Sequence, residues 1–195
     1  MVVSGPSVTT SAARGAGGIA RSITVPAMFA AMMCASAAIS IPLPGSAVPI
    51  TFQVFVTLLA GAVAGPRAGT MAVIVYILLG SAGLPVFSMM RGGFSVLLGP
   101  TGGYLAAFPL ATAVVGLLAG PSKRAGVART LVSMIAGLAV IYFVGTLRLA
   151  WITGKPAGAA ASVAVVPFIP LDTAKAVAAA VLAPRLRAIA PLRAP

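Results

Sequence analysis

Long hydrophobic runs alternate with short polar or glycine-rich stretches along most of the chain. A membrane-spanning helix needs about 20 mostly apolar residues. The pattern predicts six such helices, at about 23–40, 50–65, 68–87, 102–120, 129–152 and 170–184, with a short half-helix at about 157–168. The alternating ten-residue segments that build membrane barrels are absent from the sequence, so the predicted fold class is an all-α polytopic membrane protein.

Residues 1–22 differ from the rest of the chain, because they are rich in Gly, Ser, Thr and Ala and carry Arg14 and Arg21. This composition predicts a mobile N-terminal tail. A secretory signal is the alternative, but the basic region is long and a clear cleavage site is missing. The expected organisation is a tail at 1–22, one transmembrane domain at 23–187 and a C-terminal tail at 188–195.

The positive charges indicate how the helices are oriented. With six spans and a cytoplasmic N-terminus, the cytoplasmic side receives Arg14, Arg21, Arg67, Lys123, Arg124, Arg129, Arg185, Arg187 and Arg193. The opposite side receives the smaller set, Arg91, Arg148, Lys155 and Lys175. This excess follows the positive-inside rule, so both termini are expected in the cytoplasm.

Charged residues make up only 7% of the chain, with 13 Lys plus Arg, one acid and no His, while 60% of residues are hydrophobic. Soluble domains average about 25% charged residues, and nucleic-acid binders gather bases on a solvated face. A soluble nucleic-acid-binding protein is therefore excluded. The missing His and second acid exclude imidazole catalysis, the usual metal sites and paired-acid mechanisms. No GxxxxGK[ST] motif occurs either, so the chain cannot hydrolyse ATP by P-loop chemistry.

The only acid, Asp172, precedes Lys175 by three positions at the start of the last predicted helix. This spacing puts both side chains on one helix face. Ionisable groups at membrane depth are costly, and they face a cavity or each other by default. One interpretation is a structural ion pair. The other is a ligand site with one acceptor and one donor, which suits a small neutral amide or urea group.

Two connections between predicted helices offer further candidate contacts. In residues 83–109 the glycines interrupt any single helix, and main-chain N–H groups near the start of the 102–120 helix can meet a ligand carboxylate. Arg91 can meet the same group, or it is an exposed arginine of a tight turn. The stretch 40–53 contains three prolines yet is apolar. It either caps a binding site, with Thr51 and Gln53 as polar contacts, or lies among lipid headgroups.

Small residues recur every four positions in the first predicted helix, at Ala27, Ala31 and Ala35. Such stripes let helices approach closely in lipid. The stripe predicts a helix contact, and the spacing leaves open whether the partner is internal or another protein.

Five motifs occur in order along these segments: IPLPGSAVPITFQ, LLAGAVAGPRAG, YILLGSAGLPVF, LLGPTGGYLAAFP and PFIPLDTAK. Together they resemble the BioY family, the biotin-binding S components of energy-coupling-factor vitamin transporters, over about residues 24–187. The resemblance implies the six-helix S-component fold, with biotin held near the extracellular side. It also implies that Asp172 and Lys175 match the family's charged pair and bind the ligand.

The resemblance assigns expected roles to other segments as well. Residues 40–50 match the loop that covers the pocket, and the Ala27, Ala31 and Ala35 stripe resembles the surface that docks on the transmembrane coupling subunit. The resemblance also places Gly99 to Tyr104 in the pocket wall, so Thr101, Gly102, Gly103 and Tyr104 are expected biotin contacts. Arg91 and Gln53 are expected contacts from their places in the two connections, and the resemblance does not assign them.

The chemistry of biotin fits the charged pair, because its ureido ring carries N–H donors for Asp172, and Lys175 can donate to a polar oxygen at either end of the molecule. We therefore expect a multi-pass protein of the bacterial inner membrane that binds biotin with high affinity. It would have no catalytic activity and no cofactor, and would work with a transmembrane coupling subunit and two cytosolic ATPases. The alternatives are an S component for another vitamin, an ion-coupled secondary transporter with Asp172 as proton carrier, and an intramembrane enzyme.

Overall fold

The protein, described by a computed structural model that covers residues 8–120 and 126–189, is built almost entirely from helices. In chain order the elements are α1 (Val8–Ala38), β1 (Ser40–Ile41), β2 (Ile50–Thr51), α2 (Gln53–Ser81), η1 (Ser88–Met90), α3 (Ser95–Leu98), α4 (Gly102–Ala119), α5 (Val127–Thr153), α6 (Ala157–Ala164) and α7 (Ile169–Ile189). The last four helices confirm the predictions at 102–120, 129–152, 157–168 and 170–184.

The two ends of the predicted domain differ from the structure. Helix α1 begins at Val8, ahead of the first predicted span at 23–40, so residues 8–22 of the predicted tail are helical. Helix α7 continues to Ile189, past the predicted domain end at residue 187. Residues 1–7 and 190–195 lie outside the described residues, as do Lys123, Arg124 and Arg193.

Helix α2 is a tight hairpin rather than one straight helix. The chain leaves helical geometry at Gly65, with φ 86° and ψ 179°, and Pro66 follows. A Cβ added to Gly69 would lie 2.6 Å from the Ala60 carbonyl oxygen, and Gln53 donates a hydrogen bond to the hydroxyl of Tyr76. A straight helix would separate residues 53 and 76 by about 35 Å. The arms 53–64 and 66–81 therefore run antiparallel and correspond to the second and third predicted helices.

Four helices of the described residues are long and apolar enough to span a membrane: the Ala20–Ala38 part of α1, α2, α4 and α5. Helices α6 and α7, bent by 61° where they meet, make a fifth candidate when taken as one span. When the two arms of α2 are counted as separate passes, these helices make six passes. This number agrees with the prediction of six helices.

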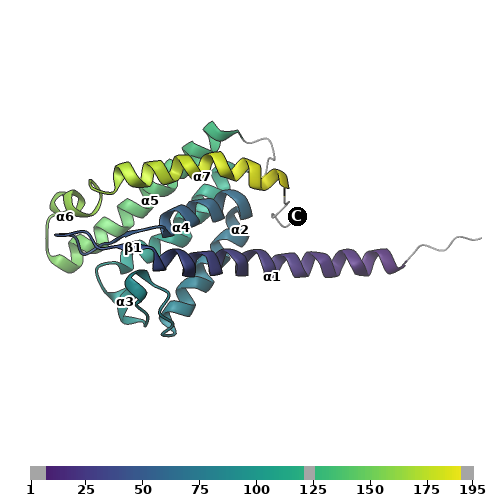
Figure 1. Ribbon diagram of the computed structural model, residues 1–195, viewed down its shortest axis with the longest axis horizontal. Coiled ribbons are helices and arrows are strands. Elements are labelled where there is room, and N and C mark those ends of the chain that lie inside the picture. Colours follow the sequence, from purple (N-terminus) through teal and green to yellow (C-terminus); the bar gives the residue numbers. More distant parts are fainter. Residues whose placement is uncertain (1–7, 121–125, 190–195) are drawn as a thin grey trace, which may run out of the picture.

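The beginning of α1 and the end of α7 lie at the same end of the molecule, and β1, α3 and α6 gather at the opposite end (Figure 1). An even number of passes requires this arrangement. The end that carries β1, α3 and α6 is called the loop end below.

Helix α4 lies at the centre of the bundle, because small residues let its neighbours approach closely. A Cβ on Gly61 of α2 would lie 3.0 Å from Cβ of Val115, and one on Gly116 would lie 2.7 Å from Cα of Pro66. Large apolar side chains such as Leu117, Val132 and Phe143 are about two-thirds exposed. An outward-facing apolar surface of this kind fits a lipid environment.

Candidate ligand-binding site

The break between α6 and α7 places the only acid inside the bundle. Main-chain bonds from Phe168 N to Val165 O, 2.9 Å, and from Asp172 N to Phe168 O, 2.8 Å, connect the break to the first turn of α7. Asp172 is only 3% exposed. A buried carboxylate needs hydrogen-bond donors and a countercharge.

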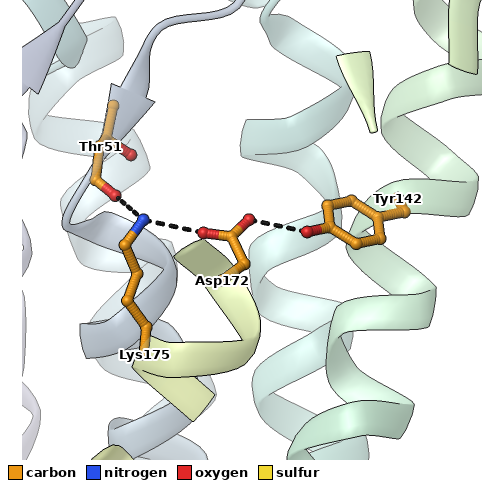
Figure 2. Close-up of polar contacts among 4 residues, drawn as sticks. All are labelled: Thr51, Tyr142, Asp172 and Lys175. Atoms are coloured by element: carbon orange, nitrogen blue, oxygen red, sulfur yellow. Dashed lines mark hydrogen bonds and ion pairs between the residues drawn. The ribbon is translucent and has the colours of Figure 1, made fainter. Parts of the chain in front are cut away.

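Both needs of Asp172 are met by neighbouring side chains (Figure 2). Lys175 Nζ lies 2.8 Å from one carboxylate oxygen, and the Tyr142 hydroxyl of α5 donates to the other at 2.9 Å. Lys175 also donates to the main-chain carbonyl of Thr51, at 2.7 Å. These contacts join β2, α5 and α7 through one ion pair with no net charge.

A cavity that is partly open to solvent lies beside this ion pair. Its lining comes from the loop before α2 and from α2, η1, α4, α5, the end of α6 and α7. The lining residues are Val48, Pro49, Thr51, Gln53, Val54, Ser88, Thr101, Tyr104, Leu105, Phe108, Ile141, Tyr142, Ala164, Phe168 and Asp172. A mostly apolar lining with a few fixed polar groups is typical of a small-molecule site.

Only some of the predicted site residues line the cavity. Asp172, Tyr104, Thr101 and Gln53 line the cavity, so the structure brings these four predicted residues together. Lys175 is not among the lining residues, although its ammonium contacts two groups that are.

Gly102 and Gly103 are not lining residues of this cavity, because each packs against another part of the chain. A Cβ on Gly102 would collide with the Leu97 carbonyl, and one on Gly103 would collide with the side chain of Arg148. The N–H groups of Gly102 and Tyr104 already donate to the carbonyls of Gly99 and Thr101, at 3.0 and 3.1 Å. These two groups at the start of α4 are therefore not available to a ligand carboxylate.

Arg91 is not a lining residue of the cavity. It is exposed, and its Nε donates to the Ser88 carbonyl at 3.4 Å. Arg91 lines two shallower hollows, and one of them also includes Thr101, a lining residue of the cavity. Arg91 is therefore separate from the cavity wall but lines a hollow that shares Thr101 with the cavity.

Sequence reasoning missed Tyr142, which binds Asp172 directly, and Phe168, which lines the cavity. Tyr142 lies 30 positions before Asp172, in the middle of an apolar helix. No local spacing relates the two residues, so only the packing of α5 against α7 reveals the contact.

Ala27, Ala31 and Ala35 are all exposed on α1. The buried face of that helix carries Val25, Phe29 and Met33 instead. The small-residue stripe therefore points away from the bundle core of the described residues.

Comparisons with known proteins agree with this arrangement. The family model described as "BioY family" matches residues 7–192. The "Biotin transporter BioY" of Thermotoga maritima is 46% identical over 160 residues, which cover 82% of this chain and 92% of the relative. The "Probable biotin transporter BioY" of Pyrococcus horikoshii is 40% identical over 168 residues, 86% of this chain and 97% of the relative.

A crystal structure also resembles this fold, that of the S-component for biotin from an ECF-type ABC transporter. Its TM-score is 0.79, at 28% sequence identity, over 87% of this chain and 92% of that chain. The family model covers nearly the whole chain, and the relatives share well over 30% of its residues across most of its length. The chain therefore belongs to the BioY family.

Proposed function

We propose that the chain is the biotin-binding S component of an ECF-type transporter, a transport protein and not an enzyme. The relatives named as biotin transporters and the S-component structure support this function. The single observation that carries it is the buried Asp172–Lys175 ion pair at the wall of an apolar cavity.

The chemistry of the cavity favours a neutral ligand that carries N–H donors. Lys175 neutralises Asp172, so a cationic ligand would meet no net negative charge. Each carboxylate oxygen of Asp172 accepts one hydrogen bond, Oδ1 from Lys175 and Oδ2 from Tyr142, and a carboxylate has about four lone-pair sites. The remaining sites suit a ureido N–H, and Phe108 and Phe168 supply apolar surface for the sulfur-containing ring.

The other end of biotin is a carboxylate, and Arg91 supplies the matching charge. The hollow that Arg91 lines adjoins the cavity through Thr101. A ligand with its ureido ring at Asp172 and its chain past Thr101 would bring its carboxylate toward the guanidinium. Gly102 and Gly103 act in this proposal by letting α4 pack closely behind the wall, rather than by touching the ligand.

The exposed surface of α1 and the charge distribution also suggest where the partner subunits bind and how the protein is oriented in the membrane. The exposed stripe of Ala27, Ala31 and Ala35 is the surface for the transmembrane coupling subunit, and two cytosolic ATPases supply the energy. Both termini face the cytoplasm of a bacterial inner membrane, in accordance with the distribution of Lys and Arg. The loop end and its cavity then face outward.

Equilibrium binding of biotin to the purified full-length protein tests this function. Asp172→Asn is expected to weaken binding at least tenfold. The amide of Asn carries no charge, and its NH2 group donates hydrogen bonds and cannot accept one from a ureido N–H. Arg185→Gln, an exposed position on the same helix, is the matched control and should bind like the wild type.

Two results would contradict the proposal. One is unchanged affinity in Asp172→Asn, and the other is displacement of bound biotin by riboflavin or thiamine at lower concentration than by biotin itself. Uptake that stops with an uncoupler at constant ATP would instead support an ion-coupled transporter with Asp172 as proton carrier.

A further inference from the structure

The ammonium group of Lys175 holds two separate parts of the site at once. It lies 2.8 Å from Asp172 Oδ1 and 2.7 Å from the main-chain oxygen of Thr51 (Figure 2). Asp172 and Thr51 line the cavity, and Lys175 does not. The lysine therefore lies behind the cavity wall and connects the buried acid with the segment that carries Thr51.

That segment is the cover of the cavity, defined here as residues 42–49 together with β1 and β2. Val48 and Pro49 of the cover line the cavity next to Thr51. Only two residue pairs close its base, Ser40 with Thr51 and Ile41 with Ile50. A short two-stranded hairpin is marginally stable by itself.

Hydrogen bonds within the cover are few and local. Ser46 N donates to the Leu43 carbonyl at 3.0 Å, and Val48 N donates to the Ser46 hydroxyl at 3.2 Å. Across residues 8–120 and 126–189, the bond from Lys175 is the one in which a side chain of a distant helix donates to the cover. A charged donor makes a stronger hydrogen bond than a neutral one, so this contact is well suited to fix the cover in place.

We propose that Lys175 is a positioning residue that holds the cover closed through the Thr51 carbonyl, and thereby limits how fast bound biotin leaves. The inference rests on the proposed function for the identity of the ligand. It assigns Lys175 a role distinct from that of Asp172, which faces the cavity. Loss of the lysine should open the cover, whereas loss of the Asp172 charge should weaken ligand contact and leave the bond to Thr51 intact.

Hydrogen–deuterium exchange of the full-length protein without ligand, in lipid nanodiscs, tests the holding role. In Lys175→Met the amides of residues 43–48 are expected to exchange about tenfold faster than in the wild type. Asp172→Asn should keep wild-type exchange there. The double variant Asp172→Asn with Lys175→Met leaves no unpaired charge at the buried Asp172 position, so it controls for misfolding of the single variant. It should exchange as fast as Lys175→Met. Lys155→Met, at an exposed lysine of the loop end, is the control and should change nothing.

A chase of bound labelled biotin with excess unlabelled biotin tests the kinetic consequence. Lys175→Met should release biotin about tenfold faster, with an association rate no lower than that of the wild type. Unchanged cover exchange in both lysine variants overturns the proposal, and so does equally fast exchange in Asp172→Asn. A slower association rate with unchanged release overturns it too. If the wild type does not bind biotin, the proposed function fails, while the exchange experiment still decides the role of Lys175.

Discussion

At the scale of single residues, Asp172 is held by donors from two helices. Lys175 of α7 and Tyr142 of α5 each contact a different carboxylate oxygen. A carboxylate fixed from two sides keeps one orientation, so its free lone pairs face a constant direction. A preorganised acceptor binds a ligand without the cost of ordering a mobile side chain.

Tyr142→Phe removes one of these two donors and leaves the ring in place. Hydrogen bonds to charged groups contribute about 1.5–3 kcal/mol, so we expect biotin affinity to fall about tenfold, as measured by equilibrium binding. Phe143→Leu, at the exposed neighbouring position, should bind normally. Equal affinities of Tyr142→Phe and wild type would show that the phenol does not orient Asp172.

Gly145 of α5 acts on the cavity through its lack of a side chain. A Cβ at this position would overlap the ring of Tyr104, and Tyr104 lines the cavity and donates to the Ala164 carbonyl at 3.3 Å. The glycine therefore determines where the tyrosine ring can lie.

Gly145→Ala is expected to displace the Tyr104 ring and weaken biotin binding about tenfold, since overpacking costs about 1–3 kcal/mol. Gly158→Ala is the matched control, because a Cβ there meets nothing within 4 Å. Binding titrations of both variants check this, and wild-type affinity in Gly145→Ala would contradict it.

At the scale of elements, the α2 hairpin and α4 form the packed centre of the bundle. Gly65 adopts a positive φ of 86° that non-glycine residues rarely adopt. Pro66 follows Gly65 in the chain, and Gly116 of α4 packs directly against Pro66. The turn between the two arms is therefore supported by a helix that follows it in the chain.

Gly116→Val should lower the stability of the whole bundle, because the added side chain has no room beside Pro66. We expect a loss of about 1–3 kcal/mol, seen as a lower thermal unfolding midpoint of the detergent-solubilised protein. Leu117→Val changes the adjacent residue, which is 66% exposed, and should leave the midpoint nearly unchanged. An unchanged midpoint in Gly116→Val would mean that α4 does not support the turn.

At the scale of the whole molecule, the cavity and the proposed docking stripe use different parts of the surface. The cavity lies among the loops of the loop end and the helix segments next to them, whereas the stripe is exposed along α1. Ligand binding and partner docking should therefore be separable by mutation.

The double variant Ala27→Leu with Ala31→Leu tests that separation. Two large side chains prevent the close helix approach that small residues allow, so co-purification with the coupling subunit and ATPases should fall at least tenfold. Biotin binding by the isolated variant should stay at the wild-type value. Val132→Leu, on an exposed face of α5, is the control. Intact co-purification of the double variant would remove the stripe from the interface.

Much of the architecture could be predicted from local sequence features. The lengths of the apolar runs predicted α4, α5 and α7 closely, because a bilayer requires about 20 apolar residues for each helix. Asp172 is the only acid of the sequence and lies among apolar residues, and this isolation indicated that it has a structural or ligand-binding role. The start of α1 was missed, because Gly, Ser and Thr in residues 8–22 lower helix propensity without forbidding a helix.

The sequence by itself determined the class of protein, the approximate helices and the ion pair, since each depends on residues close together in the chain. Only the tertiary structure decided that Tyr142 meets Asp172 and that Lys175 reaches the Thr51 carbonyl, 124 positions away. It also placed Gly102 and Gly103 outside the cavity lining, and Arg91 in a neighbouring hollow that shares Thr101 with the cavity. The physical reason is that a main-chain carbonyl has the same chemistry in every residue, so no pattern marks the one that a folded chain brings to the Lys175 ammonium.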